Sequence, residues 1–207
     1  MEINFRQRLT YVKILSIIVR LVIGVCFLRV ISGTARRILL VAPDGLSTRP
    51  TSDRAKEGLF NILGTRVKDA YVLDIFCGSG ALGIEALSRG AKAALFVDNA
   101  PSAIRAVKEN LGKTKLGNAE VLNMAAEDVI MRLAAERRQF DIIFSDPPYD
   151  AVVLNETLVL LSEAKILSEK GIVIAESDAN TQLDGFSPTD TRLYGRTKFF
   201  FFEAGAV

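Results

Sequence analysis

The chain has 207 residues, 49% of them hydrophobic, which is enough for one well-filled α/β domain. It has no histidine, which excludes His-based triads and most zinc chemistry, and no metal site is expected. The net charge of +2 hides an asymmetry, because residues 1–54 hold nine Lys/Arg residues against three acids. The basic residues 1–54 are compatible with a partner that carries phosphates, and the alternative is a basic surface that faces only solvent.

The first part of the chain is unusually apolar. Lys13, Arg20 and Arg29 divide residues 9–31 into pieces far shorter than the ~20 residues that a membrane span requires. No small-residue cleavage site follows, so a secretory signal is weak and we expect no membrane attachment. We interpret residues 1–28 as an extension from a misassigned translation start, with a disordered or loosely docked helix as the alternative.

Residues 29–50 predict a small, basic β-hairpin extension, because β-like residues 38–42 lead into the turn 43-PDG-45. The main domain is expected over residues 51–207. It starts with a helix within residues 50–63, which Thr51 or Ser52 can cap and Gly64 ends.

From residue 71 onward, apolar strands alternate with amphipathic helices. This rhythm predicts an α/β, Rossmann-like fold, with a mostly parallel sheet covered by helices on both faces. Residues 192–203 are expected to add antiparallel edge strands. The strands are expected at 71–76, 93–98, 119–124, 140–146 and 171–177, and the helices at 81–89, 101–111, 126–136 and 153–164.

Three acids follow or end neighbouring strands, at the edge of the sheet where ligands bind. They are Asp74, Asp98 and Asp146. The string 78-GSGALG-83 also matches a dinucleotide fingerprint, but Asp74 at the strand end would repel a pyrophosphate. A carboxylate there can hold an amino group, and Asp98 can accept hydrogen bonds from both ribose hydroxyls. The ligand that satisfies both requirements is S-adenosylmethionine.

The turn 146-DPPY-149 follows the fourth predicted strand and suits an amine acceptor. Its prolines remove two backbone donors and leave carbonyls free. Asp146 and the Pro147 carbonyl can accept the two N–H bonds of an exocyclic base amine and direct its lone pair toward a methyl donor. Tyr149 offers a ring on which a flipped base can stack. We therefore predict that Asp146, Pro147, Pro148 and Tyr149 form the catalytic turn.

The segments 71-YVLDIFCGSGALGIEALSRGA-91, 146-DPPYD-150 and 47-STRPTSDRAKEGLFNIL-63 together resemble the RsmD-type 16S ribosomal RNA guanine-N(2)-methyltransferases. The glycine-rich loop and the Asp-Pro-Pro-Tyr turn are shared by many amino-methyltransferases. The stretches 29-RVISGTARR-37 and 48-TRPTSDR-54 narrow the resemblance to this family. It implies the S-adenosylmethionine-dependent methyltransferase fold and methylation of the exocyclic 2-amino group of one guanine.

The resemblance also implies site residues and partners. Small-subunit ribosomal RNA is expected as the partner, within an assembled or assembling subunit, and the enzyme is expected to be a cytoplasmic monomer. RNA contacts are expected at Arg29, Arg36, Arg37, Arg49 and Arg54, although Arg54 could instead pair with Asp53 or Glu57. Cofactor contacts are expected at Asp74, Phe76, Gly78, Ser79, Gly80, Asp98, Asn99, Ala125 and Ala126.

The sequence departs from the family pattern at two places inside the resembling region. Arg37 and Ile38 stand where a glycine and a basic residue are usual, so the first hairpin is expected to differ in shape. Ala125 stands where an Asp or Asn commonly contacts the adenine amino group, which leaves a backbone N–H, Glu127 or Asp128 for that role.

The alternatives to guanine methylation in ribosomal RNA are methylation of DNA adenine or of a protein glutamine, or a non-catalytic RNA-binding assembly factor.

Overall fold

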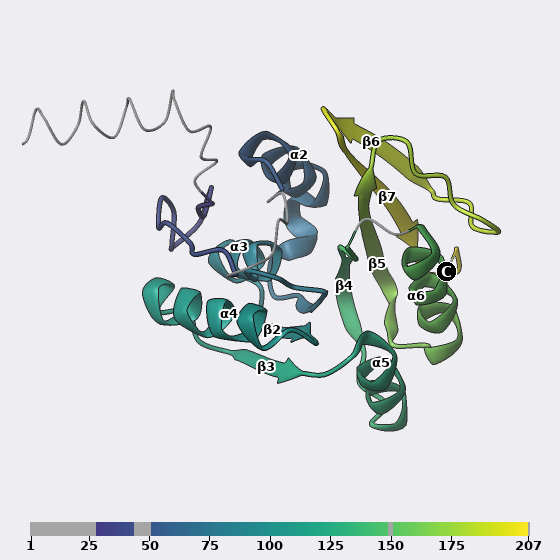
Figure 1. The fold of residues 1–207 in the computed structure, drawn as a ribbon, viewed down its shortest axis with the longest axis horizontal. Helices are drawn as coiled ribbons and strands as arrows, with labels where there is room; N and C mark the ends of the chain where they lie inside the picture. The colour runs from purple at the N-terminus through teal and green to yellow at the C-terminus, as the bar shows by residue number, and fades with distance from the viewer. Residues whose placement is uncertain (1–27, 44–50, 149–150, 207) are drawn as a thin grey trace, which may run out of the picture.

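The computed structural model describes residues 28–43, 51–148 and 151–206. These residues form a seven-stranded sheet in the order β3-β2-β1-β4-β5-β7-β6, with only β7 antiparallel to β5 and β6 antiparallel to β7 (Figure 1). The predicted mostly parallel, Rossmann-like architecture is confirmed. The apolar residues 1–27, and with them most of the proposed N-terminal extension, lie outside the described residues.

The elements follow the chain in regular alternation. The strands are β1 (Tyr71–Ile75), β2 (Ala93–Asp98), β3 (Ala119–Asn123), β4 (Phe140–Ser145), β5 (Leu167–Asp178), β6 (Asp190–Tyr194) and β7 (Thr197–Glu203). The helices are α2 (Asp53–Leu63), the 3-10 turn η1 (Gly64–Val67), α3 (Ala81–Ser88), α4 (Pro101–Thr114), α5 (Ala126–Ala135) and α6 (Ala151–Ala164). β5 starts four residues earlier than its apolar run indicated, because Leu167 pairs with Phe140.

Two apolar layers enclose the sheet. On one face, α2, α3 and α4 pack with residues such as Leu59, Ile84 and Val107. On the other face, α5 and α6 pack with residues such as Val129 and Leu158. The central strands β1 and β4 contribute to both layers, which explains why their sequences are apolar at nearly every position.

The N-terminal segment, residues 28–43, is built into the first layer. Its side chains Leu28, Val30, Ala35 and Leu40 are buried in the same cluster as α2 and α3. The segment doubles back through one isolated antiparallel bridge, between Arg29 and Leu39. The described part of the predicted hairpin is therefore a bridged loop packed on the domain; the turn after Pro43 lies outside the described residues.

The backbone of this loop accounts for one departure from the family pattern. Arg37 has φ +73°, in the left-handed region that glycine occupies without steric cost. The loop is therefore compatible with glycine at this position, and Arg37 adopts this conformation at a cost of about 1 kcal/mol. Whether the loop differs in shape from that of the family stays a prediction.

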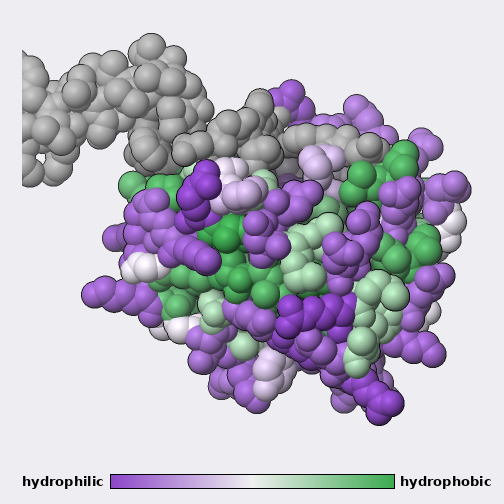
Figure 2. All heavy atoms as spheres, turned by 60° about the horizontal axis from the view of Figure 1, so that its bottom comes forward, coloured by the Kyte–Doolittle hydropathy of each residue, from purple (hydrophilic) through white to green (hydrophobic). Residues whose placement is uncertain are grey.

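Polar and apolar side chains are unevenly spread on the face of the molecule that Figure 2 shows. In the view of Figure 2, hydrophilic side chains cover most of the molecule and apolar side chains gather near the middle of the face. Within the described ranges, no helix combines the length and the apolar character needed to cross a bilayer.

Candidate active site

A pocket of about 400 Å³ lies at the carboxyl ends of β1, β2, β3 and β4. Ligands bind at this edge of open α/β sheets, next to the point where the strand order reverses, which here lies between β1 and β4. The predicted residues that line it are Asp74, Phe76, Gly78, Ser79, Asp98, Asn99, Ala125, Ala126, Asp146, Pro147 and Pro148. One cavity therefore brings together residues from four strand ends, while their binding and catalytic roles stay predictions.

The glycine-rich loop between β1 and α3 forms the floor of the pocket. Phe76, Gly78 and Gly80 have φ of +59°, +52° and +75°. Phe76 is not a glycine, so its positive φ marks local backbone strain. Such strain is common at functional sites. Gly80 does not line the pocket; it caps the N-terminus of α3, and its N–H donates to the Cys77 carbonyl at 2.6 Å. Its role is to turn the loop.

Asp98, at the end of β2, is held by two backbone donors. Its Oδ2 accepts from the Gly78 N–H and its Oδ1 from the Ala100 N–H, both at 2.9 Å. Each carboxylate oxygen has a second lone pair, so two positions remain for ligand hydroxyls. The carboxylate thus ties the glycine-rich loop to the start of α4 and presents its free edge to the pocket.

Asp74 is buried in the sheet edge, with 2% exposure, and accepts from the Gly83 N–H at 2.9 Å. Burial raises the pKa of Asp74 well above its ordinary value, and the nearby carboxylates of Asp146 and Asp98 raise it further, against the hydrogen bond from Gly83. A group in this environment ionises readily only when a cation arrives. The arrangement is suited to a positively charged ligand.

Asp146 follows the last residue of β4, and its N–H donates to the Ile75 carbonyl at 3.4 Å. Burial raises the pKa of Asp146 to about 7. Near neutral pH this side chain can therefore either accept or carry a proton, as a general base requires. Tyr149 lies outside the described residues, so the predicted stacking ring has no structural test.

Two further walls of the pocket consist of residues that the sequence did not predict as site residues. One consists of Leu28, Ala42 and Pro43 from the N-terminal segment together with Thr51. Another is the face of α6 with Val153, Glu156, Thr157 and Leu160, and Cys77, Ala81, Leu82 and Ala100 complete the lining. The i, i+3, i+4, i+7 spacing on α6 was a usable signal, since it marks one face of a helix that follows the proline turn. Glu127 also lines the pocket, and Asp128 is not among the lining residues.

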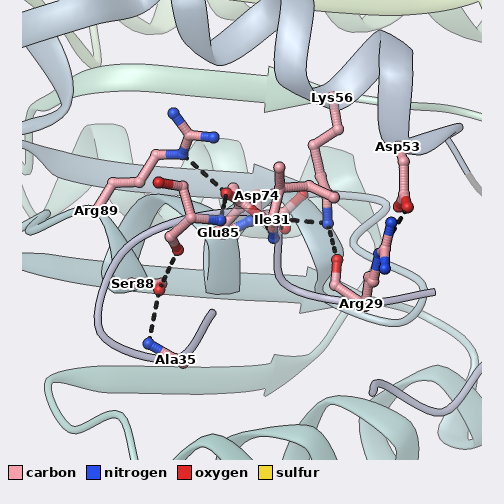
Figure 3. A network of polar contacts seen from close by, with 11 residues as sticks. Arg29, Ile31, Ala35, Asp53, Lys56, Asp74, Glu85, Ser88 and Arg89 are labelled. Atoms are coloured by element: carbon pink, nitrogen blue, oxygen red, sulfur yellow. Dashed lines mark hydrogen bonds and ion pairs between the residues drawn. The ribbon is translucent and has the colours of Figure 1, made fainter. Parts of the chain in front are cut away.

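A buried charge cluster fixes the N-terminal segment to the domain (Figure 3). Glu85 on α3 accepts from the Ile31 and Ser32 N–H groups at 2.7 and 2.9 Å, and its carboxylate pairs with Lys56 and Arg89. Burial lowers the pKa of Lys56, and the charge of Glu85 opposes that change. The cluster thereby holds the N-terminal segment, α2 and α3 at one point.

A second anchor joins the end of this segment to the glycine-rich loop. The buried Asn110 on α4 accepts from the Val41 N–H at 2.8 Å and donates to the carbonyls of Val41 and Ser79, both at 2.9 Å. Since Ala42 and Ser79 both line the pocket, Asn110 sets the distance between two of its walls.

The predicted basic residues occupy different environments. Arg29 pairs with Asp53 at 2.8 Å, so Asp53 is not the partner of Arg54 that the sequence left open. Arg54 is exposed in the first turn of α2, three residues after the pocket residue Thr51. Arg36 and Arg37 are exposed and directly follow Thr34 and Ala35, whose N–H groups donate to Ser88. Ser88 is the last residue of α3, roughly 10 Å along that helix from its pocket-lining start. Arg49 lies outside the described residues.

Known proteins share both the sequence and the fold. The family described as conserved hypothetical protein 95 matches residues 28–203. The ribosomal RNA small subunit methyltransferase D of Escherichia coli K12 is 38% identical over 156 residues, 75% of this chain and 77% of that protein. The structure of a hypothetical protein of Thermus thermophilus superposes with TM-score 0.75 at 30% identity, covering 85% of this chain and 99% of that one.

A more distant structural neighbour is the Thermus thermophilus 16S rRNA N2 G1207 methyltransferase, solved in complex with AdoMet and guanosine. It matches with TM-score 0.61 at 22% identity, over 77% of this chain and 44% of that one. At this identity the likeness establishes the fold alone.

Proposed function

This chain belongs to the conserved hypothetical protein 95 family, which includes the RsmD-type ribosomal RNA methyltransferases, and from that premise we propose that it methylates the 2-amino group of one guanine in small-subunit (16S) ribosomal RNA. S-adenosylmethionine is the proposed donor. An assembled or assembling small subunit is the proposed substrate, which places the enzyme in the cytoplasm, where it acts as a monomer.

The observation that carries this proposal is the set of three carboxyl side chains around one pocket. Asp74, Asp98 and Asp146 all line it. Asp74 suits the ammonium end of the donor, and Asp98 suits the ribose hydroxyls through its two free lone pairs. The pocket volume of about 400 Å³ is in the range of small-molecule sites. When bound, S-adenosylmethionine supplies a methyl group on a positively charged sulfur.

Asp146 and Pro147 are the proposed contacts of the reacting amine. The Asp146 carboxylate and the Pro147 carbonyl accept its two N–H bonds, so the nitrogen lone pair points into the pocket. The amine would thereby present its lone pair to the methyl group that the donor supplies, and the donor sulfur would keep the electron pair of the broken C–S bond. The nitrogen then loses one proton to Asp146. With its pKa raised by burial to about 7, Asp146 can take that proton and later release it to water.

Arg54 is the proposed RNA contact nearest the reacting turn. It is exposed on the first turn of α2, next to the pocket residue Thr51, and forms no ion pair among the described residues. Arg36 and Arg37 are proposed to contact phosphates farther along the RNA. Arg29 faces Asp53 and contributes to RNA binding only as part of this pair.

The test is methyl transfer to small-subunit particles from cells that lack this gene. The protein is incubated with labelled S-adenosylmethionine and, in parallel, these particles, free 16S RNA, DNA or a glutamine-containing peptide. Label in one N2-methylguanosine of the particles is expected, and none with Asp146→Asn. Label in DNA adenine or peptide glutamine would contradict the substrate, and donor binding without transfer to any of them would contradict the enzymatic role.

A further inference from the structure

Glu176 is a buried acid next to Asp146 that the proposed reaction does not use. Ser145 on β4 pairs with Ala175 on β5, so Asp146, which follows β4, and Glu176, two residues before the end of β5, stand at adjacent positions of neighbouring chains of the sheet. Glu176 has 8% exposure, and its Oε2 accepts from the Thr51 hydroxyl at 2.7 Å. Thr51 lines the pocket, so Glu176 lies directly behind its wall.

Glu176 has acidic neighbours and no cationic partner among the described residues. The titratable groups that act on it are Asp146 at the end of β4 and Asp74 in β1, and its other contacts are the hydroxyls of Thr51 and Thr197. None of the ion pairs within the described ranges includes Glu176. Buried carboxylates at such close range cannot all ionise, because each negative charge disfavours the next.

The environment separates the two neighbouring acids. Burial raises the pKa of Glu176 well above its ordinary value, and the negative charge of Asp146 raises it further. The hydrogen bonds from Thr51 and Thr197 partly oppose this rise. Burial raises the pKa of Asp146 to about 7. Asp146 is part-exposed and lines the pocket, whereas Glu176 is buried behind the pocket wall. Because burial disfavours the charged form, we expect Asp146 to lose its proton first as the pH rises, while Glu176 keeps its own.

We propose that Glu176 is a positioning residue for methyl transfer: held by Thr51, it stays protonated beside Asp146 and so leaves Asp146 free to ionise and accept the amine. The proposal rests on the proposed function of this pocket. If Glu176 were ionised, its negative charge would favour the protonated form of Asp146. Asp146 could then no longer accept the N–H of the amine. A neutral, hydrogen-bonded neighbour keeps water out without adding that charge.

Four variants test the proposal: Glu176→Gln, Glu176→Ala, Thr51→Val and Asp146→Asn. Glutamine reproduces a protonated glutamate, so E176Q is expected to retain the single-turnover rate within about threefold and to keep the acid limb of its pH profile within about half a unit. E176A admits water behind Asp146, which moves the acid limb to lower pH by about one unit. T51V removes a donor that favours the ionised form of Glu176, so Glu176 keeps its proton and the acid limb of T51V is expected to stay within about half a unit of the wild type. D146N is expected to lose the reaction.

A spectroscopic measurement tests the protonation without the reaction. In the infrared spectrum at about pH 8, the carbonyl band of protonated carboxyl groups should be weaker in E176Q than in the wild type by one carboxyl group, and unchanged in D146N. An E176Q rate as low as that of D146N, or an equal infrared band in E176Q and wild type, would overturn the proposal. An unchanged pH profile in E176A would also overturn it. If the wild type transfers no methyl group, the proposed function fails, and the infrared result still decides the state of Glu176.

Discussion

The Nζ atom of Lys56 lies 3.3 Å from Oε2 of Glu85, and both side chains have no solvent exposure. Breaking a buried pair leaves one charge without compensation, at a cost of about 3 to 5 kcal/mol. Glu85→Gln leaves Lys56 without its charged partner and should lower the free energy of unfolding by about 3 kcal/mol, measured in urea. Lys56→Met should cost less, because Glu85 remains paired with Arg89. In the double variant the losses should fall short of their sum by about 1.5 kcal/mol or more. Simple additivity would show that the pair is not coupled.

Gly33 approaches α3 so closely that a side chain cannot fit. A Cβ at this position would lie 1.8 Å from the Ser88 carbonyl oxygen, and the residue has φ +84°. Gly33→Ala should therefore destabilise the protein by about 3 kcal/mol or more through combined strain and displacement of the N-terminal segment. Gly90→Ala is the matched control, with φ +99° but open space around its Cβ. Equal losses in the two variants would mean that the contact with Ser88 does not matter.

Asn110 should affect the affinity for the donor more than the rate of transfer. Asn110→Asp keeps the acceptor for the Val41 N–H but sets a negative oxygen against the carbonyls of Val41 and Ser79. We expect the KM for S-adenosylmethionine to rise about tenfold, with a smaller change in kcat, and N110A to be milder than N110D. Asn61→Asp on the exposed side of α2 should have no effect. A milder N110D than N110A would contradict the role given to the two carbonyls.

Asp146 should cost the protein stability as the pH rises. Its pKa in the folded state, about 7, lies above the ordinary value of 3.8, so its contribution to folding is fully present below about pH 4 and is lost as the pH rises through about 7. Asp146→Asn cannot ionise. Its free energy of unfolding relative to the wild type should therefore improve by about 1 kcal/mol or more between pH 4 and pH 8. Parallel stability curves for the two proteins would refute the burial argument.

Arg54 should contribute more to RNA binding near the reacting turn than Arg36. Removing a phosphate contact lowers the slope of log K against log salt by about one unit. Arg54→Ala should show this change together with a lower methyl-transfer rate, whereas Arg36→Ala should change the slope and leave the rate of the bound complex intact. Arg137→Ala is the control, since this exposed residue precedes β4 at the opposite edge of the sheet. A changed slope in the control would indicate non-specific attraction.

The sequence predicted the alternating elements because apolar periodicity is a local property. The buried strands and the caps of α2 follow from neighbouring residues, as does the turn at Gly78 and Gly80. The burial of Lys56 could not be predicted from neighbouring residues. It depends on the ion pair with Glu85, which belongs to another helix. Ile31 and Ser32 bind to Glu85 on α3, a residue more than fifty positions later in the sequence. Apolar periodicity does not indicate which distant residues come into contact.

The pocket was predicted in part for the same reason. The rule that acids at strand ends mark a site identified Asp74, Asp98 and Asp146, and it applied equally to Glu176 in the run 171-GIVIAES-177. The significance of Glu176 arises only when β5 lies beside β4, and that neighbour relationship is set by topology. Thr51 and Pro43 reach the pocket through the docked N-terminal segment and α2, so no local pattern indicated them.

The hydrogen bond between Thr51 and Glu176 joins residues 125 positions apart. A nascent chain emerges at about 5 to 20 residues per second, so many seconds separate the arrival of its donor from that of its acceptor. Until β5 has left the exit tunnel, the wall behind Asp146 is missing. Newly synthesised molecules thus complete this wall of the pocket only near the end of translation, and products of stalled synthesis that end before β5 lack it.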